Sequence, residues 1–293
     1  MVDYTPHCLH SNTVVEIVYP PQPGDWHTGS MCGRYVMARA IGDLMAATGA
    51  DTVNFEQLSP DYNVAPTKDV PIVVEHPHDP RDPSTTWQRH LYLAKWGLVP
   101  MWAKDLSFGQ RTFNARSESV VDKPSFRAAV KARRAAIPVD GYYEWLAPET
   151  KGERKQPYFV RPKDGSPIFF AGLYEWWKDP AAADDAPWVL STTMLTGPSP
   201  QAGAEPPILN ELAGLHDRLP LPMSPAMTND WLSAGDVSKA EATHLVDAVL
   251  ADAYNVASEW EMYPVDPAVG SVRNNGPELI EPFDPTGGQS TLV

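Results

Sequence analysis

The sequence predicts an α+β fold built around a single core. Runs of apolar and β-branched residues alternate with loops that hold many of the chain's 31 prolines and 19 glycines, which favours short strands over a helical bundle. Hydrophobic residues make up 43% of the 293 residues, enough for a sizeable core, and no stretch resembles a linker between domains. Helical periodicity is confined to a few segments, so strands and helices are expected to share one core.

Three segments are expected to be helical. Ile41–Ala47 fits a short helix that stops at Gly49, a residue favoured just beyond helix ends. Lys123–Ala132 fits a helix with a basic face. Asp236 is predicted to cap a third helix over Val237–Asp252, whose apolar residues recur at helical spacing.

The expected strands are short apolar runs with β-branched and aromatic residues, each bounded by loop residues. Pieces rich in Pro, Gly and Asp separate several of them, and no internal repeat is present. The expected strands are Val70–Glu75, Leu91–Leu98, Tyr158–Arg161, Ile168–Leu173 and Trp188–Thr193.

The two ends of the chain differ from its middle. Residues 1–30 are expected to be a disordered extension or the product of a start assigned too far upstream, because Met31 already supplies a start. The globular domain is expected over residues 31–283. The tail at residues 284–293 contains Gly and Ser and is expected to be frayed.

Charge and cysteine content exclude several classes of protein. The formal net charge is -14, which argues against non-specific binding of polyanions but leaves room for a local basic groove. The two cysteines, Cys8 and Cys32, are too few for a disulfide framework. No apolar run approaches the roughly 18 residues of a membrane span, and the N-terminus lacks the features of a secretory signal. A cytoplasmic protein without membrane contact is expected.

Cys32 is the most informative residue of the chain. It follows Met31 and precedes Gly33, as in a start site whose Met is removed. An N-terminal cysteine carries an α-amine and a thiol on adjacent carbons, and together they can capture an aldehyde as an imine and then as a thiazolidine. The alternative is a small buried hydrophobe, as free cysteines often are.

Basic residues gather in two places. Arg34, two residues after Cys32, can lower the thiol pKa and hold a phosphate, or it can make an ordinary surface contact. Between Arg111 and Arg134, seven basic residues face two acidic ones, in an otherwise acidic chain. This window predicts a groove for a nucleic-acid backbone, and the alternative is a solvated helix face.

Two further residues are candidates for proton transfer. Glu144 lies between Tyr143 and Trp145, which predicts partial desolvation and a raised pKa, unless a strand there turns the carboxylate to water. His216 is suited to proton transfer near neutral pH, although a lone histidine is more often structural. No histidine pair has further ligands at metal-binding spacing, and no phosphate-binding glycine loop is present, so no metal or cofactor is expected.

These pieces together resemble one family, the SOS response-associated peptidases (SRAP), also described as abasic site processing proteins. The similarity covers about Met31 to Pro282, and the order and spacing of its motifs make it specific. The matching motifs are Met31-Cys32-Gly33-Arg34-Tyr35, Tyr62-Asn63-Val64-Ala65-Pro66, Trp96-Gly97-Leu98-Val99-Pro100 with Trp102, Phe113-Asn114-Ala115-Arg116-Ser117-Glu118, Gly141-Tyr142-Tyr143-Glu144-Trp145, Ala171-Gly172-Leu173-Tyr174, His216-Asp217-Arg218-Leu219-Pro220, Asn274-Asn275 and Glu278-Leu279-Ile280.

The resemblance implies a mainly antiparallel, barrel-like β core flanked by helices, and a monomer that acts on DNA damage. It implies binding of single-stranded DNA and a thiazolidine crosslink between an N-terminal cysteine and the aldehyde of an abasic site. The implied catalytic residues are Cys32 as nucleophile, Asn114 on the opened sugar, Glu144 as proton shuttle and His216 as acid or base. The implied DNA-binding residues are Arg34 and Arg116 on phosphates and Trp102 as a stacking platform.

One departure from the family pattern concerns the thirty residues before Met31. The implied chemistry needs a free α-amine on Cys32, so either translation starts at Met31, or the extension is removed, or the thiazolidine cannot form. Two alternative functions follow. The chain is a thiol autopeptidase that cleaves before Cys32 with the help of Glu144 and His216, or it binds single-stranded DNA without a covalent step. If the chain crosslinks abasic sites, association with the nucleoid after damage is expected.

Overall fold

The computed structural model describes residues 33–285, apart from residues 80, 81, 149, 151, 153, 184 and 234 and the side chains of residues 78, 79 and 82–85. The expectations for Cys32, for the extension at residues 1–30 and for residues 286–293 of the tail fall outside this part. None of the helices in the described ranges is long and apolar enough to cross a membrane.

The larger sheet closes on itself. Its strands pair in the order β12-β11-β10-β7-β4-β5-β2, and β11 also pairs with β5 in parallel, Ser191 with Lys95 and Thr192 with Trp96. This last pairing turns β11-β10-β7-β4-β5 into a ring. The strands are β2 (Thr52–Val53), β4 (Asp69–Asp79), β5 (Asp82–Trp96), β7 (Arg134–Val139), β10 (Ile168–Trp177), β11 (Val189–Pro198) and β12 (Arg218–Pro220), with β6 (Asn114–Arg116) on β11 and β13 (Pro222–Met223) on β10.

A second, fully antiparallel sheet has the order β14-β9-β8-β1-β3. It brings the first described strand against the middle of the chain, because β1 lies between β8 and β3. Its strands are β1 (Tyr35–Met37), β3 (Asp61–Val64), β8 (Gly141–Leu146), β9 (Gln156–Pro162) and β14 (Trp260–Pro264).

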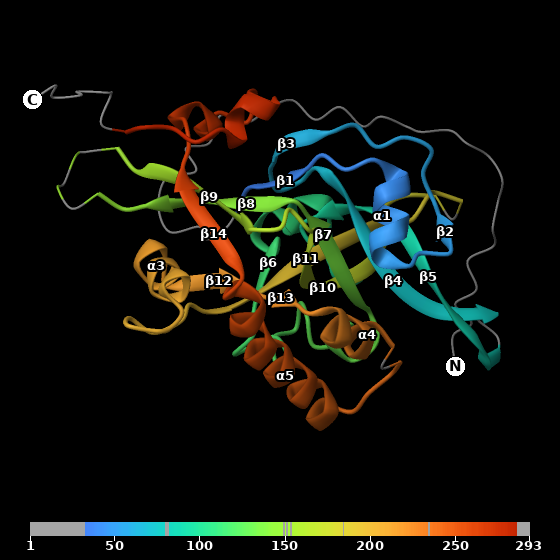
Figure 1. The fold of residues 1–293 in the computed structure, drawn as a ribbon. Coiled ribbons are helices and arrows are strands. Elements are labelled where there is room, and N and C mark those ends of the chain that lie inside the picture. The colour runs from blue at the N-terminus through green and yellow to red at the C-terminus, as the bar shows by residue number, and fades with distance from the viewer. Residues whose placement is uncertain are drawn as a thin grey trace, which may run out of the picture.

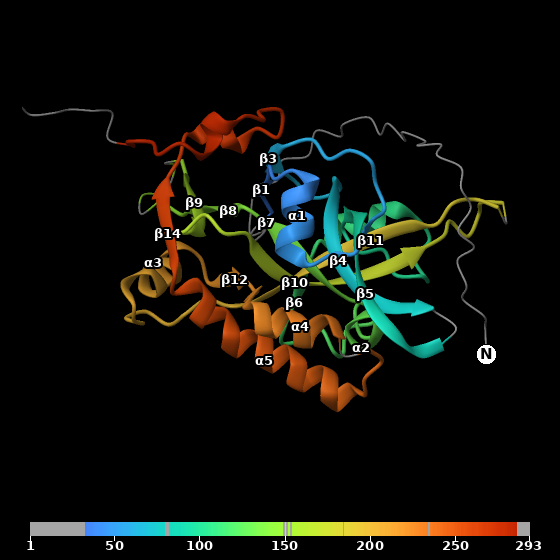
Figure 2. The ribbon, with the colours of Figure 1, turned by 45° about the vertical axis from the view of Figure 1, so that its right-hand side comes forward.

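Helices cover the sheets from several sides. Figures 1 and 2 show α4 and α5 beneath the strands, and the C-terminal segment on the opposite side, beside β3 and β1. The α-helices are α1 (Ile41–Thr48), α2 (Ala129–Ala132), α3 (Pro207–Leu215), α4 (Pro225–Ser233) and α5 (Lys239–Ala257), and the 3₁₀ helices are η1 (Leu106–Arg111), η2 (Pro267–Gly270) and η3 (Pro277–Ile280).

One hydrophobic core joins these layers. It runs from the ring of strands to α1, α4 and α5, and its largest fully buried side chains include Trp96, Trp231 and Trp260. The indole nitrogens of Trp96 and Trp231 donate to backbone carbonyls, so neither buried N–H lacks a hydrogen-bond acceptor. The predicted α+β class, with a mainly antiparallel, barrel-like core in a single domain, is confirmed.

The predicted helices fared unevenly. The first is correct, and Gly49 follows it in the left-handed conformation. The third begins later than predicted, because Ser238 and Glu241 form a capping box in place of Asp236. The second prediction is mostly wrong, since only Ala129–Ala132 is helical and residues 124–128 form turns.

Candidate functional site

The first described residues lie against the strand that carries Glu144. Tyr35 pairs with Tyr142, and the backbone N–H of Tyr143 donates to the carbonyl of Arg34 at 3.0 Å. Glu144 is the next residue along β8. Cys32 lies outside the described residues, but it is joined to Gly33, which is the first of them.

Glu144 is shielded from water as predicted, although Tyr143 and Trp145 point to the other face of β8, where they pack in a separate cluster. Its exposed fraction is 4%, and one carboxylate oxygen accepts the backbone N–H of Trp145 at 3.1 Å. The alternative placed Glu144 on a strand with its carboxylate turned to water. The strand is present, but the carboxylate is buried, so this alternative is wrong. The role of Glu144 in proton transfer remains a prediction.

A chain of aromatic rings connects β1 with the segment that carries Asn114. The ring of Tyr35 lies 4.9 Å from that of Trp96, which in turn meets Phe113 edge-on at 5.8 Å. The indole N–H of Trp96 also donates to the carbonyl of Phe113 at 2.9 Å. Because Asn114 follows Phe113 directly, this packing fixes the start of β6 relative to β1.

Asn114 and Arg116 extend from β6 into different surroundings. β6 runs parallel to β11 and pairs over Met194–Thr196. The side-chain oxygen of Asn114 is buried, whereas Arg116 is exposed. Within the described ranges, the guanidinium of Arg116 has no hydrogen bond or ion pair. An exposed, unengaged guanidinium is suited to a phosphate.

His216 lies on the other side of β11. It follows α3, which contacts β8, and it precedes β12, which pairs with β11. The backbone N–H of Arg218 donates to its Nδ1 at 3.0 Å, and a carboxylate oxygen of Asp217 lies 2.9 Å from the same atom. The two contacts require opposite protonation of Nδ1. Asp217 is 86% exposed, so we assign the backbone contact to neutral His216, whose proton then sits on Nε2.

An ion pair ties the His216 and Asn114 segments together across β11. The two terminal guanidinium nitrogens of Arg218, Nη1 and Nη2, donate to Glu118, the second at 2.9 Å. The same side chain donates to the carbonyl of Thr196 at 2.8 Å, which also accepts the N–H of Ser117 at 2.9 Å. Arg218 and Glu118 belong to the motifs of His216 and Asn114, but sequence reasoning gave them no role.

Trp102 is an exposed platform. Its exposed fraction is 58%, its ring meets Phe108 edge-on at 5.0 Å, and the guanidinium of Arg111 lies 5.2 Å from the Phe108 ring. Gly97 shapes this loop, with φ at 139° and its backbone so close to Gly109 that a side chain on either residue would clash with the other.

The basic window is only partly a surface. Arg134 is 4% exposed, and its guanidinium donates to the carbonyls of residues 130, 131, 231 and 235. Arg133 pairs with Glu175 at 2.7 Å. Neither is therefore available to a nucleic-acid backbone, which corrects the expectation for this end of the window. Arg116, Lys123 and Arg127 are exposed.

Arg34 also differs from a simple surface cation. Its guanidinium donates to Asn63 and to two carbonyls in the C-terminal segment, and burial lowers its pKa from the ordinary value. Asn63 is fully buried and sequence reasoning missed it as a site residue, although it belongs to one of the recognised motifs.

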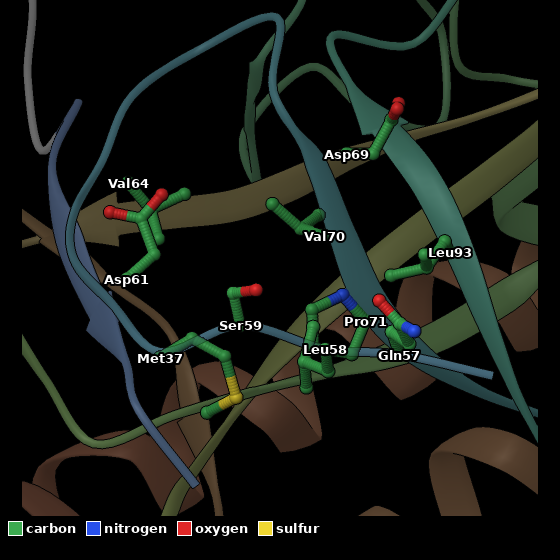
Figure 3. Close-up of a pocket in the computed structure, with 10 residues that line it drawn as sticks. All are labelled: Met37, Gln57, Leu58, Ser59, Asp61, Val64, Asp69, Val70, Pro71 and Leu93. Atoms are coloured by element: carbon green, nitrogen blue, oxygen red, sulfur yellow. The ribbon is translucent and has the colours of Figure 1, made fainter. Parts of the chain in front are cut away.

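A cavity of about 200 Å³ lies elsewhere, between the start of β4 and the loop before β3. None of the predicted site residues lines it, and Figure 3 shows mainly aliphatic side chains around it. The predicted site therefore lies outside this cavity. The lining residues are Met37, Gln57, Leu58, Ser59, Asp61, Val64, Asp69, Val70, Pro71 and Leu93.

Comparison with known proteins decides the family. The family model described as "SOS response associated peptidase (SRAP)" matches residues 31–272. The chain belongs to this family. Among curated SRAP relatives, "Abasic site processing protein YoqW" of Bacillus subtilis (strain 168) is 32% identical over 255 residues, covering 86% of this chain and 99% of the relative.

A second SRAP relative and a solved structure agree with this assignment. "Abasic site processing protein YedK" of Escherichia coli (strain K12) is 30% identical over 262 residues, covering 86% of this chain and 100% of the relative. A crystal structure of a protein from Bacteroides thetaiotaomicron has a TM-score of 0.64 at 20% identity, covering 86% of this chain and 100% of that chain. At that identity, the structural likeness concerns the fold alone.

Proposed function

We propose that this SRAP protein binds single-stranded DNA and captures abasic sites covalently through Cys32, once Cys32 is the N-terminal residue. The observation that supports the proposal is that the strand of Glu144 pairs with the strand that Cys32 precedes. The neighbours of the other two residues pack nearby: α3, which His216 follows, contacts β8, and Phe113, which precedes Asn114, is linked through Trp96 to Tyr35. The names of the curated relatives, abasic site processing proteins, point to the same substrate.

The chemistry needs only the cysteine and the opened sugar. The α-amine attacks the aldehyde carbon C1′, and loss of one water gives an imine. The thiol sulfur then adds to the imine carbon, while the thiol proton passes to nitrogen. One C–N bond and one C–S bond form at C1′, and the product is a thiazolidine that shields the lesion.

The buried and half-buried groups take the proton-transfer roles in this scheme. Glu144 accepts a proton from the attacking amine and returns it to the departing oxygen. His216, with its proton on Nε2, donates to the sugar oxygen during ring opening and assists reversal. Asn114 hydrogen-bonds the opened sugar near the reacting carbon.

The exposed groups bind the DNA strand. Arg116 contacts a phosphate, and Trp102 stacks on a base or fills the gap left by the missing one. Because an abasic site has no base to unstack, presenting its sugar to the protein is inexpensive. The net charge of -14 makes binding to intact DNA weak and salt-sensitive. The protein is expected to act as a monomer in the cytoplasm.

Intact mass spectrometry tests this function directly. A chain that begins at Cys32 is mixed with a single-stranded oligonucleotide that contains one abasic site, and a matched sample receives the undamaged oligonucleotide. The expected result is a covalent adduct with the abasic strand alone, absent in Cys32→Ala. A Cys32→Ala chain that forms an equally stable adduct without reductant would remove Cys32 from the mechanism.

A second candidate function is self-cleavage before Cys32, favoured by the word peptidase in the family description and by a family match that starts at Met31. Cleavage there would release the α-amine that the crosslink requires. Intact mass of the purified full chain over time distinguishes the two. Autocleavage is supported if the wild type forms a product that begins at Cys32 and the variants Glu144→Gln or His216→Ala do not. A wild-type full chain that stays intact contradicts it.

A further inference from the structure

Arg34 sits in a socket of neutral oxygen acceptors. Its Nη1 donates to the side-chain oxygen of Asn63 at 2.6 Å and to the carbonyl of Val269 at 2.9 Å. Its Nη2 donates to the carbonyl of Gly270 at 3.0 Å. No carboxylate lies within ion-pairing distance of this guanidinium among the residues that the structure describes. The socket therefore holds the cation through neutral acceptors, and the carboxylate of Asp61 acts on it only from a greater distance.

Asn63 is the centre of this socket. It is fully buried, and while its oxygen accepts from Arg34, its amide nitrogen lies 3.1, 2.9 and 2.9 Å from the carbonyls of Val269, Ser271 and Asn274. The two hydrogens of this amide are shared among the three carbonyls, whereas a carboxylate or an aliphatic side chain has no N–H to offer them.

The acceptors belong to one segment, Asp266–Asn275, which we call the C-terminal strap. The strap is fastened to β3 a second time, where the backbone N–H of Tyr62 donates to the side chain of Asn275 at 2.7 Å. Within the strap, the side-chain amide of Asn274 donates to the carbonyl of Ala268 at 2.7 Å. The two motifs that contain Asn63 and Asn275 thus bind each other across more than two hundred residues of sequence.

The other side of Arg34 is fixed to the strand of Glu144. Its carbonyl accepts the N–H of Tyr143 at 3.0 Å, and its guanidinium carbon lies 6.0 Å from the centre of the Trp145 ring. Cys32 precedes Arg34 by two residues, and two residues span at most about 7 Å. Fixing Arg34 on both sides therefore limits where Cys32 can go relative to Glu144.

Arg116 shows the contrast. Its guanidinium is exposed and has no partner within the described ranges, whereas that of Arg34 already makes three hydrogen bonds. A phosphate would reach Arg116 without breaking an internal contact. For Arg34, full engagement with a phosphate would compete with the socket.

We propose that Arg34 is a positioning residue that anchors the segment following Cys32 in a socket made by Asn63 and the C-terminal strap. The inference rests on the proposed function, because that function makes Cys32, two residues before the anchored arginine, the nucleophile. Arg34 thereby departs from the phosphate-binding role that the family resemblance implied. The strap becomes part of the reactive site although it supplies no reacting atom.

The test separates the rate of crosslinking from the affinity for DNA. The rate constant is measured with saturating abasic DNA for chains that begin at Cys32, and affinity is measured over a salt series with undamaged single strands. Misplacement of a reacting group by about 1 Å costs roughly 10²-fold in rate. Asn63→Ala is expected to slow the saturated rate about 10- to 100-fold with affinity and salt slope unchanged.

Arg116→Ala is the matched control for a phosphate ligand. It is expected to weaken binding of undamaged strands and to lower the log–log salt slope by about 0.7. If Arg34→Ala behaves in the same way as Arg116→Ala, the anchoring role is wrong. A wild-type saturated rate in Asn63→Ala would overturn it as well.

Arg34→Lys carries the test if Asn63→Ala does not fold. Lysine keeps the charge for a phosphate but loses the planar fork that the socket fits. The anchoring role predicts a slower saturated rate in Arg34→Lys, and a phosphate role predicts a rate near that of the wild type.

A readout without DNA keeps this inference distinct from the proposed function. Hydrogen exchange of the Tyr143 amide, which donates to Arg34, is expected to accelerate at least 10-fold in Asn63→Ala, with core amides unaffected. Unchanged exchange at Tyr143 contradicts the socket. If exchange accelerates but the wild type forms no crosslink, the anchor stands and the proposed function fails.

Discussion

Replacement of Glu144 by glutamine separates its shape from its titration. The carboxylate is 4% exposed and accepts the N–H of Trp145 at 3.1 Å, a contact that the glutamine oxygen can also make. The fold should therefore lose little, and we expect the free energy of unfolding to change by less than about 1 kcal/mol. What glutamine cannot do is accept a proton from the attacking amine.

The expected kinetic effect is large. A positioned acid–base group contributes about 10²–10⁴-fold, which corresponds to about 2.7–5.4 kcal/mol in the activation free energy at 1.36 kcal/mol per tenfold. The assay is a crosslinking time course with saturating abasic single strands at several pH values, beside equilibrium binding of undamaged DNA. Glu144→Gln should lose this rate and flatten the pH profile while its affinity for DNA stays within about twofold of the wild type.

Glu175 provides a matched control. It is 7% exposed, and it accepts the N–H of Trp176 at 3.1 Å, as Glu144 does from Trp145. Its second oxygen pairs with Arg133, away from the predicted site. Glu175→Gln should cost stability but leave the crosslinking rate constant unchanged. If Glu144→Gln loses affinity in proportion to rate, or reacts as fast as the wild type, the proton-transfer role is wrong.

Three further outcomes follow from individual contacts. Arg218 lowers the pKa of Glu118. This pair therefore stabilises the fold above the ordinary carboxyl pKa of about 4.3, and the stabilisation is lost as the pH falls through the lowered pKa. In urea unfolding, the free energy of unfolding of Glu118→Gln should be up to about 1 kcal/mol below that of the wild type at pH 7, and this difference should vanish in acid. Arg134→Met should lower the free energy of unfolding by about 3–5 kcal/mol, because four carbonyls lose a buried charged donor, and a loss below 1 kcal/mol would contradict this account. Trp102→Ala should weaken binding of undamaged single strands by about 1–3 kcal/mol without a change in thermal stability, and equal affinity would place the stacking platform elsewhere.

Local signals in the sequence predicted local structure well. The helix before Gly49 is correct to within a residue, because a left-handed glycine ends a helix by backbone geometry alone. The cap of α5 was misplaced by two residues, although Ser238 and Glu241 form the Ser-x-x-Glu pattern of a capping box. Here the sequence contained the signal and Asp236 was a competing candidate.

The predictions for the basic window between Arg111 and Arg134 were partly wrong because of tertiary packing. Residues 123–132 have helical composition, but only the last turn is helical, because Phe126 and Arg134 are drawn into the interior. A charge run is expected to face water, and nothing in its local pattern shows that Arg134 meets four carbonyls from α2, α4 and a loop. Burial of an arginine depends on acceptors that the chain supplies a hundred residues away.

The site itself could be predicted only through the family motifs. Asn114, Glu144 and His216 come from three different strands or strand ends, and nothing in their spacing places them together. Glu144 had a local signal in its aromatic neighbours and is indeed buried, but Tyr143 and Trp145 lie on the opposite face of β8, so the burial comes from other contacts. The socket of Arg34 had none, because two of its acceptors are backbone carbonyls at residues 269 and 270.

Some arginines of this acidic protein are engaged in internal hydrogen bonds and others are exposed, and this difference helps to explain how the protein could act on DNA. With a net charge of -14, long-range electrostatics oppose the approach of a polyanion, so few phosphate contacts can be made and affinity for intact strands is low. Under the proposed function, retention at a lesion comes from the covalent bond to Cys32 rather than from charge. The cations then serve two ends: Arg116 meets the strand, while Arg34 and Arg218 hold the reactive segments in register. Such a protein releases undamaged DNA readily and remains only where an aldehyde is present.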